Sequence, residues 1–391
     1  MAPIPFHLSS ISSVFLILAS IHVFYTWLSA IRRGWRASQQ EKNDSEQPLP
    51  AKPPPVSIIV PAWNERGTIE PCIHSLQEIT YPYWEAIILA GGQDGTYEAT
   101  LEAIADDSRF RVFVRGPEGK NVVLTRGIDA AMYDILVLLD ADSIVAPDWL
   151  NKLVAPLLSG ASATYGFYLP QKWTWVSTAE YMQQIEYHNK KSPIFPGCAS
   201  EAIRRESLVS SGSLTAEAYS WEDLDVVARL LKVNGQIIPV GQAKLISNRP
   251  TTLGEYWRFT LRTFRAQMAG LWYHRKTFLR HPKDAFYGFF FIGYGALLSL
   301  AMIAAILAVV VQPSLLPIVI TWMVLLAFWI FGRRAALAGE VAAYKHELKW
   351  LAWFWAPVAI LFAQIWAALF SILTVWKQSS FDYKGQRDTF I

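Results

Sequence analysis

The chain has 391 residues, of which 52% are apolar and only 17% are charged, against roughly 25% charged in an ordinary soluble domain. A formal net charge of +3 is too small to indicate a nucleic-acid-binding face, and two cysteines make neither a disulfide framework nor a cysteine-based metal site. The charged residues are unevenly spread, because residues 1–31, 285–332 and 351–376 contain no Asp, Glu, Lys or Arg. The composition therefore excludes a disordered chain and predicts an integral membrane protein with one sizeable water-facing domain.

The first apolar run, residues 8–31, is long enough to cross a bilayer as a helix. Its positive charges, Arg32-Arg33 and Arg36, follow the run, whereas a cleaved signal peptide carries them before it. By the positive-inside rule we expect residues 1–31 to be an uncleaved anchor whose C-terminal side faces the cytoplasm. The next part, 32–55, is polar and proline-rich and reads as a linker to a cytoplasmic domain.

From Val56 onward, short apolar runs alternate with helical stretches. The pattern predicts strands over Val56–Val60, Glu85–Leu89, Phe110–Val114 and Ile135–Leu139, with helices over Gly67–Glu78, Tyr97–Ala105 and Asn121–Ala131 between them. Continuous apolar strands separated by helices are typical of a parallel sheet that is covered on both faces. We therefore predict an α/β domain over residues 56–250, built on a doubly wound open sheet.

In such sheets, ligands bind beyond the carboxyl ends of the strands. The last predicted strand is followed there by Asp140-Ala141-Asp142. Two carboxylates separated by one residue suit Mg²⁺ or Mn²⁺, which take oxygen ligands from the protein and from substrate phosphates. The alternative is that the two acids only cap the following turn, but their place directly after an all-apolar strand favours the metal.

A second acidic cluster, Glu222-Asp223, stands at the start of a predicted helix. Acids in a first helical turn are ordinary helix chemistry, because they complement the helix dipole. A carboxylate at a helix start in a cleft also suits a general base. The residues alone leave both interpretations open.

In chain order, five motifs resemble those of family 2 glycosyltransferases. The five are Val60-Pro61-Ala62-Trp63-Asn64-Glu65, Asp94-Gly95-Thr96, Gly119-Lys120-Asn121, Asp140-Ala141-Asp142 and Glu222-Asp223. The membrane-integrated members are most similar: ceramide glucosyltransferases and the hyaluronan, cellulose and poly-N-acetylglucosamine synthases. The resemblance spans residues 56–270. It implies a GT-A fold, a nucleotide-sugar donor and inversion at the anomeric carbon.

The resemblance also implies a role for each matching residue. Asp223 would be the base that deprotonates the acceptor hydroxyl, and Asp142, with Asp140, would hold the metal. The residues that would bind the nucleotide sugar are Pro61, Glu65, Asp94, Lys120, Asp140, Arg262 and Arg265. The two arginines match a Gln/Arg-x-x-Arg-Trp motif within 251–284, a segment that we expect to form amphipathic helices at the membrane surface. A purely lipid-facing role for these arginines is the alternative.

Two positions depart from the family pattern. The Trp of the last motif is replaced by Ala266, and in polymerising members that aromatic residue helps to hold the growing sugar chain. The Asp-Asp-Gly-Ser expected after the second strand is replaced by Ala90-Gly91-Gly92-Gln93, which leaves Asp94 as the nearby acid. The second departure weakens the expectation of a uridine donor.

Further membrane segments are expected within residues 285–376, over about 285–311, 315–331 and 351–376. Four full spans would place the tail, 377–391, outside, yet its basic residues favour the cytoplasm, so the side on which it lies stays open. The first expectation for the function is transfer of one sugar to a membrane lipid. The alternatives are a processive polysaccharide synthase and an inactive scaffold subunit. The expected partners are a nucleotide sugar, a lipid or glycan acceptor and membrane lipids, without nucleic acid.

Overall fold

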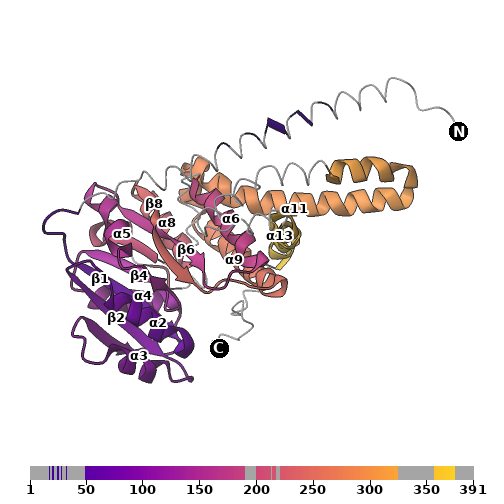
Figure 1. Cartoon of the computed structure of the whole chain (residues 1–391). Coiled ribbons are helices and arrows are strands. Elements are labelled where there is room, and N and C mark those ends of the chain that lie inside the picture. The colour runs from indigo at the N-terminus through magenta and orange to yellow at the C-terminus, as the bar shows by residue number, and fades with distance from the viewer. Residues whose placement is uncertain are drawn as a thin grey trace.

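The computed structural model describes residues 49–189, 200–212, 214–216, 221–324 and 356–374, with a few positions between Ile17 and Arg32. The predicted anchor, most of the linker and the C-terminal tail lie outside the described residues, as do Cys198 and the segment 325–355. In Figure 1 the sheet and its helices form one unit, and the helices that follow residue 252 lie beside it.

An eight-stranded sheet forms the centre of the first unit, with the strand order β3-β2-β1-β4-β7-β6-β8-β5. The strands are β1 (Val56–Trp63), β2 (Trp84–Gly91), β3 (Phe110–Val114), β4 (Ile135–Leu139), β5 (Ile144–Val145), β6 (Ala163–Pro170), β7 (Ser200–Arg204) and β8 (Ile237–Ser247). β1 pairs in parallel with β2 and β4, and β2 pairs in parallel with β3. The four strands predicted from the sequence therefore form the parallel half of the sheet.

The other half corrects the expectation of a wholly parallel, doubly wound sheet. β7 lies between β4 and β6 and is antiparallel to both, and β5 is antiparallel to β8. β6 and β8 are parallel, with an irregular register between Tyr165 and Phe167. The sheet is thus mixed and open. The sequence pattern missed this half because its strands are not continuous apolar runs of ordinary length: β5 has two residues, and β7 begins with Ser200-Glu201.

Helices cover both faces of the sheet. They are α2 (Arg66–Gln77), α3 (Thr96–Ile104), α4 (Lys120–Ala130), α5 (Trp149–Leu158), α6 (Trp175–Asn189), α7 (Arg205–Ser211) and α8 (Glu222–Lys232). On one face, Ile73 of α2 and Leu153 of α5 join the apolar core, and on the other face Leu124 of α4 and Val226 of α8 do so. The start of α8 therefore lies against the same face of the sheet as α4.

The remaining helices follow the sheet unit. They are α9 (Leu253–Tyr273), α10 (Arg275–Arg280), α11 (Pro282–Val311), the 3-10 turn η1 (Pro313–Leu315) and α13 (Ala356–Thr374), with further helical residues at 316–324. α9 begins with a capping box, in which Thr252 and Glu255 satisfy each other's backbone N–H groups. α13 packs against α9, α11 and α6, so it joins the sheet unit to the helices.

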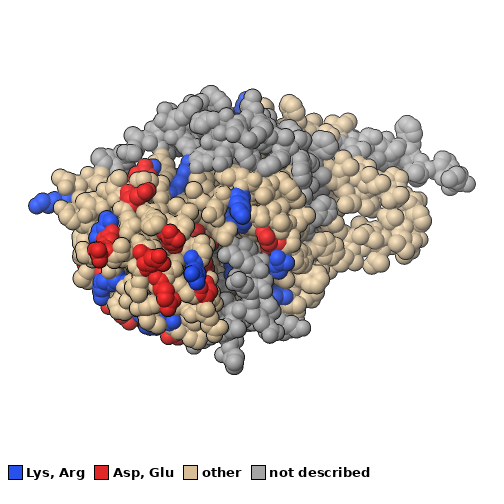
Figure 2. All heavy atoms as spheres, turned by 60° about the horizontal axis from the view of Figure 1, so that its bottom comes forward, with Lys and Arg blue, Asp and Glu red and all other residues tan. Residues whose placement is uncertain are grey.

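Charged residues lie on the sheet unit and on α9 and α10, whereas α11 exposes apolar side chains. Figure 2 shows acidic and basic side chains gathered over the sheet unit, whereas the helical arm that projects to the right carries almost none on this face. Large apolar side chains of α11 are exposed, among them Val310 (73%) and Val311 (85%). Over the described residues, no helix meets the length and hydropathy expected of a transmembrane span.

Candidate active site

The carboxyl ends of β1 and β4 meet at the candidate site. Pro61 lies within β1, and Asp140 follows the last residue of β4, with its side chain 40% exposed. Burial, together with the nearby charges of Asp142, Asp140 and Glu65, raises the pKa of the Cys72 thiol in α2. Three of the acids predicted from sequence therefore lie around the same end of the sheet.

Lys120, the first residue of α4, joins two acids that are far apart in sequence. Its Nζ lies 2.8 Å from Asp140 Oδ1 and 2.8 Å from Glu222 Oε1. Burial acts to lower the pKa of Lys120, but the negative charges of Asp140 and Glu222 outweigh it and hold the pKa well above its ordinary value. The lysine therefore stays charged and ties the end of β4 to the start of α8.

A small cavity of about 20 Å³ opens at this junction, which is enough for about one water molecule. It is lined by Pro61, Lys120, Leu124, Leu138, Leu139, Asp140, Glu201, Glu222, Asp223 and Val226. Four residues predicted from the sequence meet here: Pro61, Lys120, Asp140 and Asp223. Glu201 was missed, because it lies in β7, which the sequence pattern did not predict.

The two adjacent acids at the start of α8 have opposite electrostatic environments. Burial and the nearby charges of Glu201 and Glu222 raise the pKa of Asp223 well above its ordinary value. Burial also acts on Glu222, but the charge and hydrogen bond of Lys120 outweigh it and lower the pKa of that carboxyl. Glu222 is therefore held as a charged partner of the lysine, while Asp223 has a higher affinity for a proton. Two acids separated in this way are able to divide binding and proton transfer between them.

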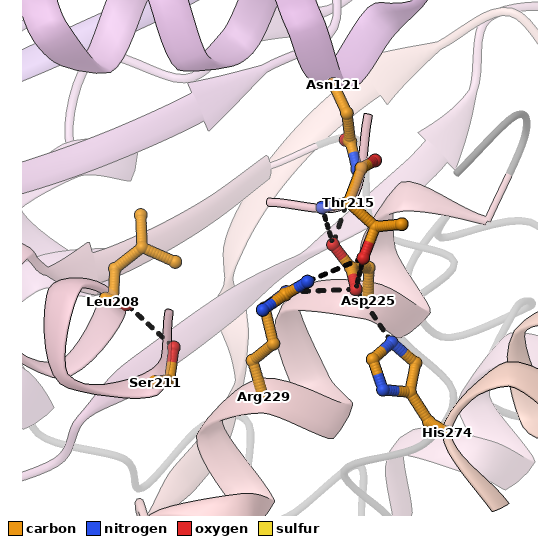
Figure 3. A network of polar contacts seen from close by, with 7 residues as sticks. All are labelled: Asn121, Leu208, Ser211, Thr215, Asp225, Arg229 and His274. Carbon is orange, nitrogen blue, oxygen red and sulfur yellow. Dashed lines mark hydrogen bonds and ion pairs between the residues drawn. The ribbon is translucent and has the colours of Figure 1, made fainter. Parts of the chain in front are cut away.

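A third acid of the same helix, Asp225, is fully buried and holds α8 in place (Figure 3). Its carboxylate accepts hydrogen bonds from the backbone N–H (2.7 Å) and hydroxyl (2.8 Å) of Thr215 and from Nε of Arg229 (3.0 Å). His274 Nε2, from the junction of α9 and α10, lies 2.7 Å from Asp225 Oδ1, and Asn121 Nδ2 lies 3.4 Å from Oδ2. Asp225 is not among the residues that line the cavity, and it connects α8 to three other segments.

The loop after β2 is joined to the start of α2. The Asp94 carboxylate accepts hydrogen bonds from the backbone N–H of Arg66 (3.1 Å) and from the Thr96 hydroxyl (2.6 Å), and the Glu65 N–H donates to Thr96 Oγ1 (2.7 Å). Burial acts to raise the pKa of Asp94, but these hydrogen bonds outweigh it and lower the pKa. The cavity lining does not include Glu65 or Asp94. In the structure they order the loop beside the site.

An arginine that was not predicted from the sequence lies next to this loop. Arg115 is buried, and its guanidinium group stacks over the Trp63 ring at 5.2 Å from the ring centre. A Cβ atom at Gly91 would lie 2.1 Å from the Arg115 carbonyl oxygen, so only glycine fits where β2 ends. The Ala-Gly-Gly-Gln departure from the family pattern thus coincides with a close approach of the chain after β3.

The two predicted arginines of α9 lie in different environments. The charge of Arg262 contributes to lowering the pKa of Glu222, which places Arg262 near the site. Arg265 instead donates from Nε (3.0 Å) and Nη2 (2.7 Å) to the Thr374 hydroxyl of α13. Arg262 therefore belongs to the site side of α9, and Arg265 to its contact with α13.

Ala266, where the family pattern has tryptophan, lies in the packing between α8 and α9. It is buried in an apolar cluster with Trp221 and Leu224. A Cβ atom at Gly270 would lie 2.7 Å from Leu224 Cδ2 and 3.0 Å from Trp221 Cε3. Small residues on α9 therefore let it approach the helix that carries Asp223.

Asp140 and Asp142 are the candidate ligands for a divalent cation at this site. Within the described residues there is no group of three or more His, Cys, Asp or Glu side chains that would hold a metal ion by themselves. Asp140 and Asp142 nevertheless fit Mg²⁺ or Mn²⁺, because such ions commonly bind one or two protein carboxylates and complete their shell with substrate phosphates and water. A metal here would depend on a bound diphosphate.

Part of the chain is similar to known glycosyltransferases. The family model described as "Glycosyl transferase family 2" matches residues 57–210. Poly-beta-1,6-N-acetyl-D-glucosamine synthase of Staphylococcus aureus is 29% identical over 138 residues, which is 35% of this chain and 31% of that protein. Glycosyltransferase AglE of Haloferax volcanii is 28% identical over 108 residues, which is 27% of this chain and 36% of that protein. The chain thus spans less than half of the length of these curated relatives.

A solved structure matches over nearly the whole chain. The mannosyltransferase PcManGT from Pyrobaculum calidifontis, in complex with GDP-Man and Mn²⁺, aligns with a TM-score of 0.61 at 17% identity and covers 93% of this chain and 98% of that one. This likeness shows the fold, a GT-A-like mixed open sheet. By the family match over residues 57–210 and by this fold, the chain is similar to the family 2 glycosyltransferases.

Proposed function

We propose that this chain transfers one sugar from a nucleotide-sugar donor to a membrane lipid, with inversion at the anomeric carbon. One observation carries the proposal. Asp223, a buried acid with a raised pKa, lines the same cavity as Lys120 and Asp140 at the end of the parallel strands. A base and a cationic binding group next to each other are what the transfer of a sugar from a diphosphate to a hydroxyl requires.

The chain's own residues account for the steps of this reaction. Lys120 and Arg262 attract the donor's diphosphate and stabilise its growing charge, and the charged Glu222 holds Lys120 in position. The acceptor oxygen forms a bond to the anomeric carbon as the bond from that carbon to the diphosphate oxygen breaks. The electron pair leaves with the diphosphate, and Asp223 takes the hydroxyl proton.

Asp140 and Asp142 are the residues that would hold Mg²⁺ or Mn²⁺. When bound, such an ion neutralises negative charge on the leaving diphosphate. The proposal includes both uridine and guanosine donors, because Ala90 and Gly91 stand where the family pattern has acids, and Arg115 lies close to Gly91.

A lipid acceptor is supported by two features. Ala266 is buried against α8, so α9 lacks the aromatic side chain that polymerising relatives use to hold a sugar chain. The exposed apolar side chains of α11 and the three uncharged runs in the sequence favour contact with lipid. On this basis we place the protein in a membrane, with the sheet unit on the cytoplasmic side as the arginines after residue 31 predict.

The second candidate is a processive polysaccharide synthase. It is favoured by the similarity over 138 residues to poly-beta-1,6-N-acetyl-D-glucosamine synthase. An inactive scaffold is disfavoured, because Lys120, Asp140, Glu222 and Asp223 meet at one cavity.

The experiment that tests the proposal uses membranes that contain the full chain and a panel of radiolabelled UDP- and GDP-sugars. After extraction, a single labelled band in the organic phase is the expected result. A high-molecular-weight ladder in the aqueous phase would instead establish the synthase. Labelling that equals that of membranes without the chain, for every donor, would overturn both.

A further inference from the structure

Glu201 occupies a position in β7 where the sheet pattern calls for an apolar side chain. It is directly opposite Leu138 of β4 in the antiparallel register, and directly opposed residues point to the same face of a sheet. Leu138 belongs to the apolar cluster formed with α4 and α8, and so does Ile203, two residues after Glu201. The Glu201 side chain is therefore directed toward the start of α8.

The carboxyl group of Glu201 is nearly removed from water. The residue is 6% exposed, among the apolar side chains that line the inner wall of the cavity, Leu124, Leu138 and Val226. Burying a carboxylate costs free energy unless charges or hydrogen bonds compensate for it. A buried acid in a cleft is a candidate for a functional role.

Glu201 and Asp223 line the same cavity, so the buried charge of Glu201 lies close enough to act on Asp223. We propose that Glu201 acts through Asp223 as a positioning residue, and that its negative charge makes Asp223 a stronger base toward the acceptor hydroxyl. This inference rests on the proposed function, because it assumes that Asp223 takes the acceptor's proton. The raised pKa of Asp223, to which burial contributes most and Glu201 next, agrees with it.

Several other charged groups face Asp223 and must be counted with Glu201. Glu222, its neighbour in α8, and Asp140, after β4, also raise the pKa of Asp223, whereas Lys120 of α4 lowers it. Arg262 of α9 acts on the adjacent Glu222. Glu222 and Asp140 each pair with Lys120 at 2.8 Å, and a substitution at Glu201 leaves both of these pairs in place.

The first test is the pH dependence of kcat/KM for Glu201→Gln in membranes that contain the full chain. A base must lose its proton before it acts, so the rate falls at pH values below its pKa. Without the charge of Glu201, Asp223 gives up its proton more readily, and the acid limb should move down by about one pH unit. The matched control is Glu85→Gln, which removes another buried carboxylate from the same sheet. Glu85 lies on β2 and is paired with Arg111 of β3 at 3.1 Å. The acid limb of this control should coincide with that of the wild type, and a Glu201→Gln limb that also coincides would overturn the proposal.

The second test reads the same interaction without enzymatic activity. A carboxyl whose pKa is raised in the folded state contributes stability at low pH that is lost as the pH rises through that pKa. The drop in melting temperature from about pH 5 to about pH 8 should therefore be smaller in Glu201→Gln and in Asp223→Asn than in the wild type. Combining the two substitutions should give less than the sum of their effects, because each removes the same repulsion.

Strict additivity would show that the two carboxyl groups do not interact, and would sink the proposal. The two tests also separate this inference from the proposed function. If no nucleotide sugar is used at all, the proposed function fails, while the melting experiment still decides whether Glu201 acts on Asp223.

Discussion

At the scale of single residues, the site depends on how neighbouring acids are distinguished. Glu222 and Asp223 are adjacent in sequence, but only Glu222 is paired with Lys120. The pairing lowers the pKa of Glu222, whereas burial and nearby negative charges raise that of Asp223. The proposed function uses this difference, with Glu222 as a fixed charge and Asp223 as the proton acceptor. The two pKa values differ in direction because Lys120, the first residue of α4, contacts Glu222.

Asp142 gives a direct test of the metal. We expect Asp142→Asn to reduce transfer by about 100-fold, because the amide is a weaker ligand for a hard cation, while the folding of the domain changes little. Transfer measured over a Mg²⁺ and Mn²⁺ titration checks this, and the variant should need more metal than the wild type. Undiminished transfer in excess chelator would contradict a metal role.

At the scale of elements, α8 is the part that the rest of the molecule positions. Asp225 ties it to Thr215, Arg229 and His274, and Gly270 lets α9 pack closely beside it. The first turn of α8, which carries Asp223, is thus fixed from several sides. Preorganisation of this kind keeps a catalytic group in place without cost at the moment of reaction.

Replacing Asp225 by Asn should destabilise the protein by about 3–5 kcal/mol at neutral pH, because it leaves Arg229 without its buried partner. Burial acts to raise the pKa of Asp225, but its hydrogen bonds and the charge of Arg229 outweigh this and lower it. Its contribution is therefore present above the ordinary Asp pKa of about 3.9 and is lost as the pH falls through the lower folded-state value. Chemical denaturation of both proteins at neutral and at acidic pH checks this, and an equal difference at both would contradict it.

The two arginines of α9 make a matched pair of substitutions. Arg262→Ala should weaken donor binding about tenfold or more, because it removes a positive charge near Glu222. Arg265→Ala should leave donor binding nearly unchanged and loosen the contact with Thr374 of α13. Donor affinity measured by calorimetry distinguishes them. Equal losses of affinity would show that both arginines bind the diphosphate.

The sequence predicted the parallel half of the sheet, whose strands are continuous apolar runs. Val56, Phe110 and Ile135 begin strands as expected, because short continuous apolar runs are typical of buried parallel strands. β7 escaped prediction because Ser200-Glu201 interrupts its apolar pattern. Site residues near strand ends were predictable from the sheet rule, but Glu201 and Arg115 were not, because their roles depend on contacts between distant segments.

At the scale of the whole molecule, the sheet unit and the helical arm differ in surface chemistry. The first carries the charges and the second exposes apolar side chains such as Val310 and Val311 (Figure 2). α13 connects them through its contacts with α9 and α6. An enzyme that joins a water-soluble donor to a lipid acceptor needs both kinds of surface next to the same site.

The arginines that follow the first apolar run predict the side of the membrane on which the sheet unit lies. Protease added outside sealed cells should leave residues 37–284 intact, because the arginines at 32, 33 and 36 keep the following domain in the cytoplasm. Inside-out vesicles provide the control, in which the same domain should be cut. Cleavage from outside in intact cells would reverse the proposed topology.

The most direct measurement of the central claim is the rate of sugar transfer by Asp223→Asn beside Glu222→Gln, with donor binding measured on the same samples. If Asp223 is the base, its amide variant should lose about 10²–10⁴-fold in rate with donor affinity nearly unchanged. Glu222→Gln should mainly weaken donor binding, since it releases Lys120. Retention of more than about a tenth of wild-type transfer by Asp223→Asn would contradict the claim, because the loss of a base costs more than that.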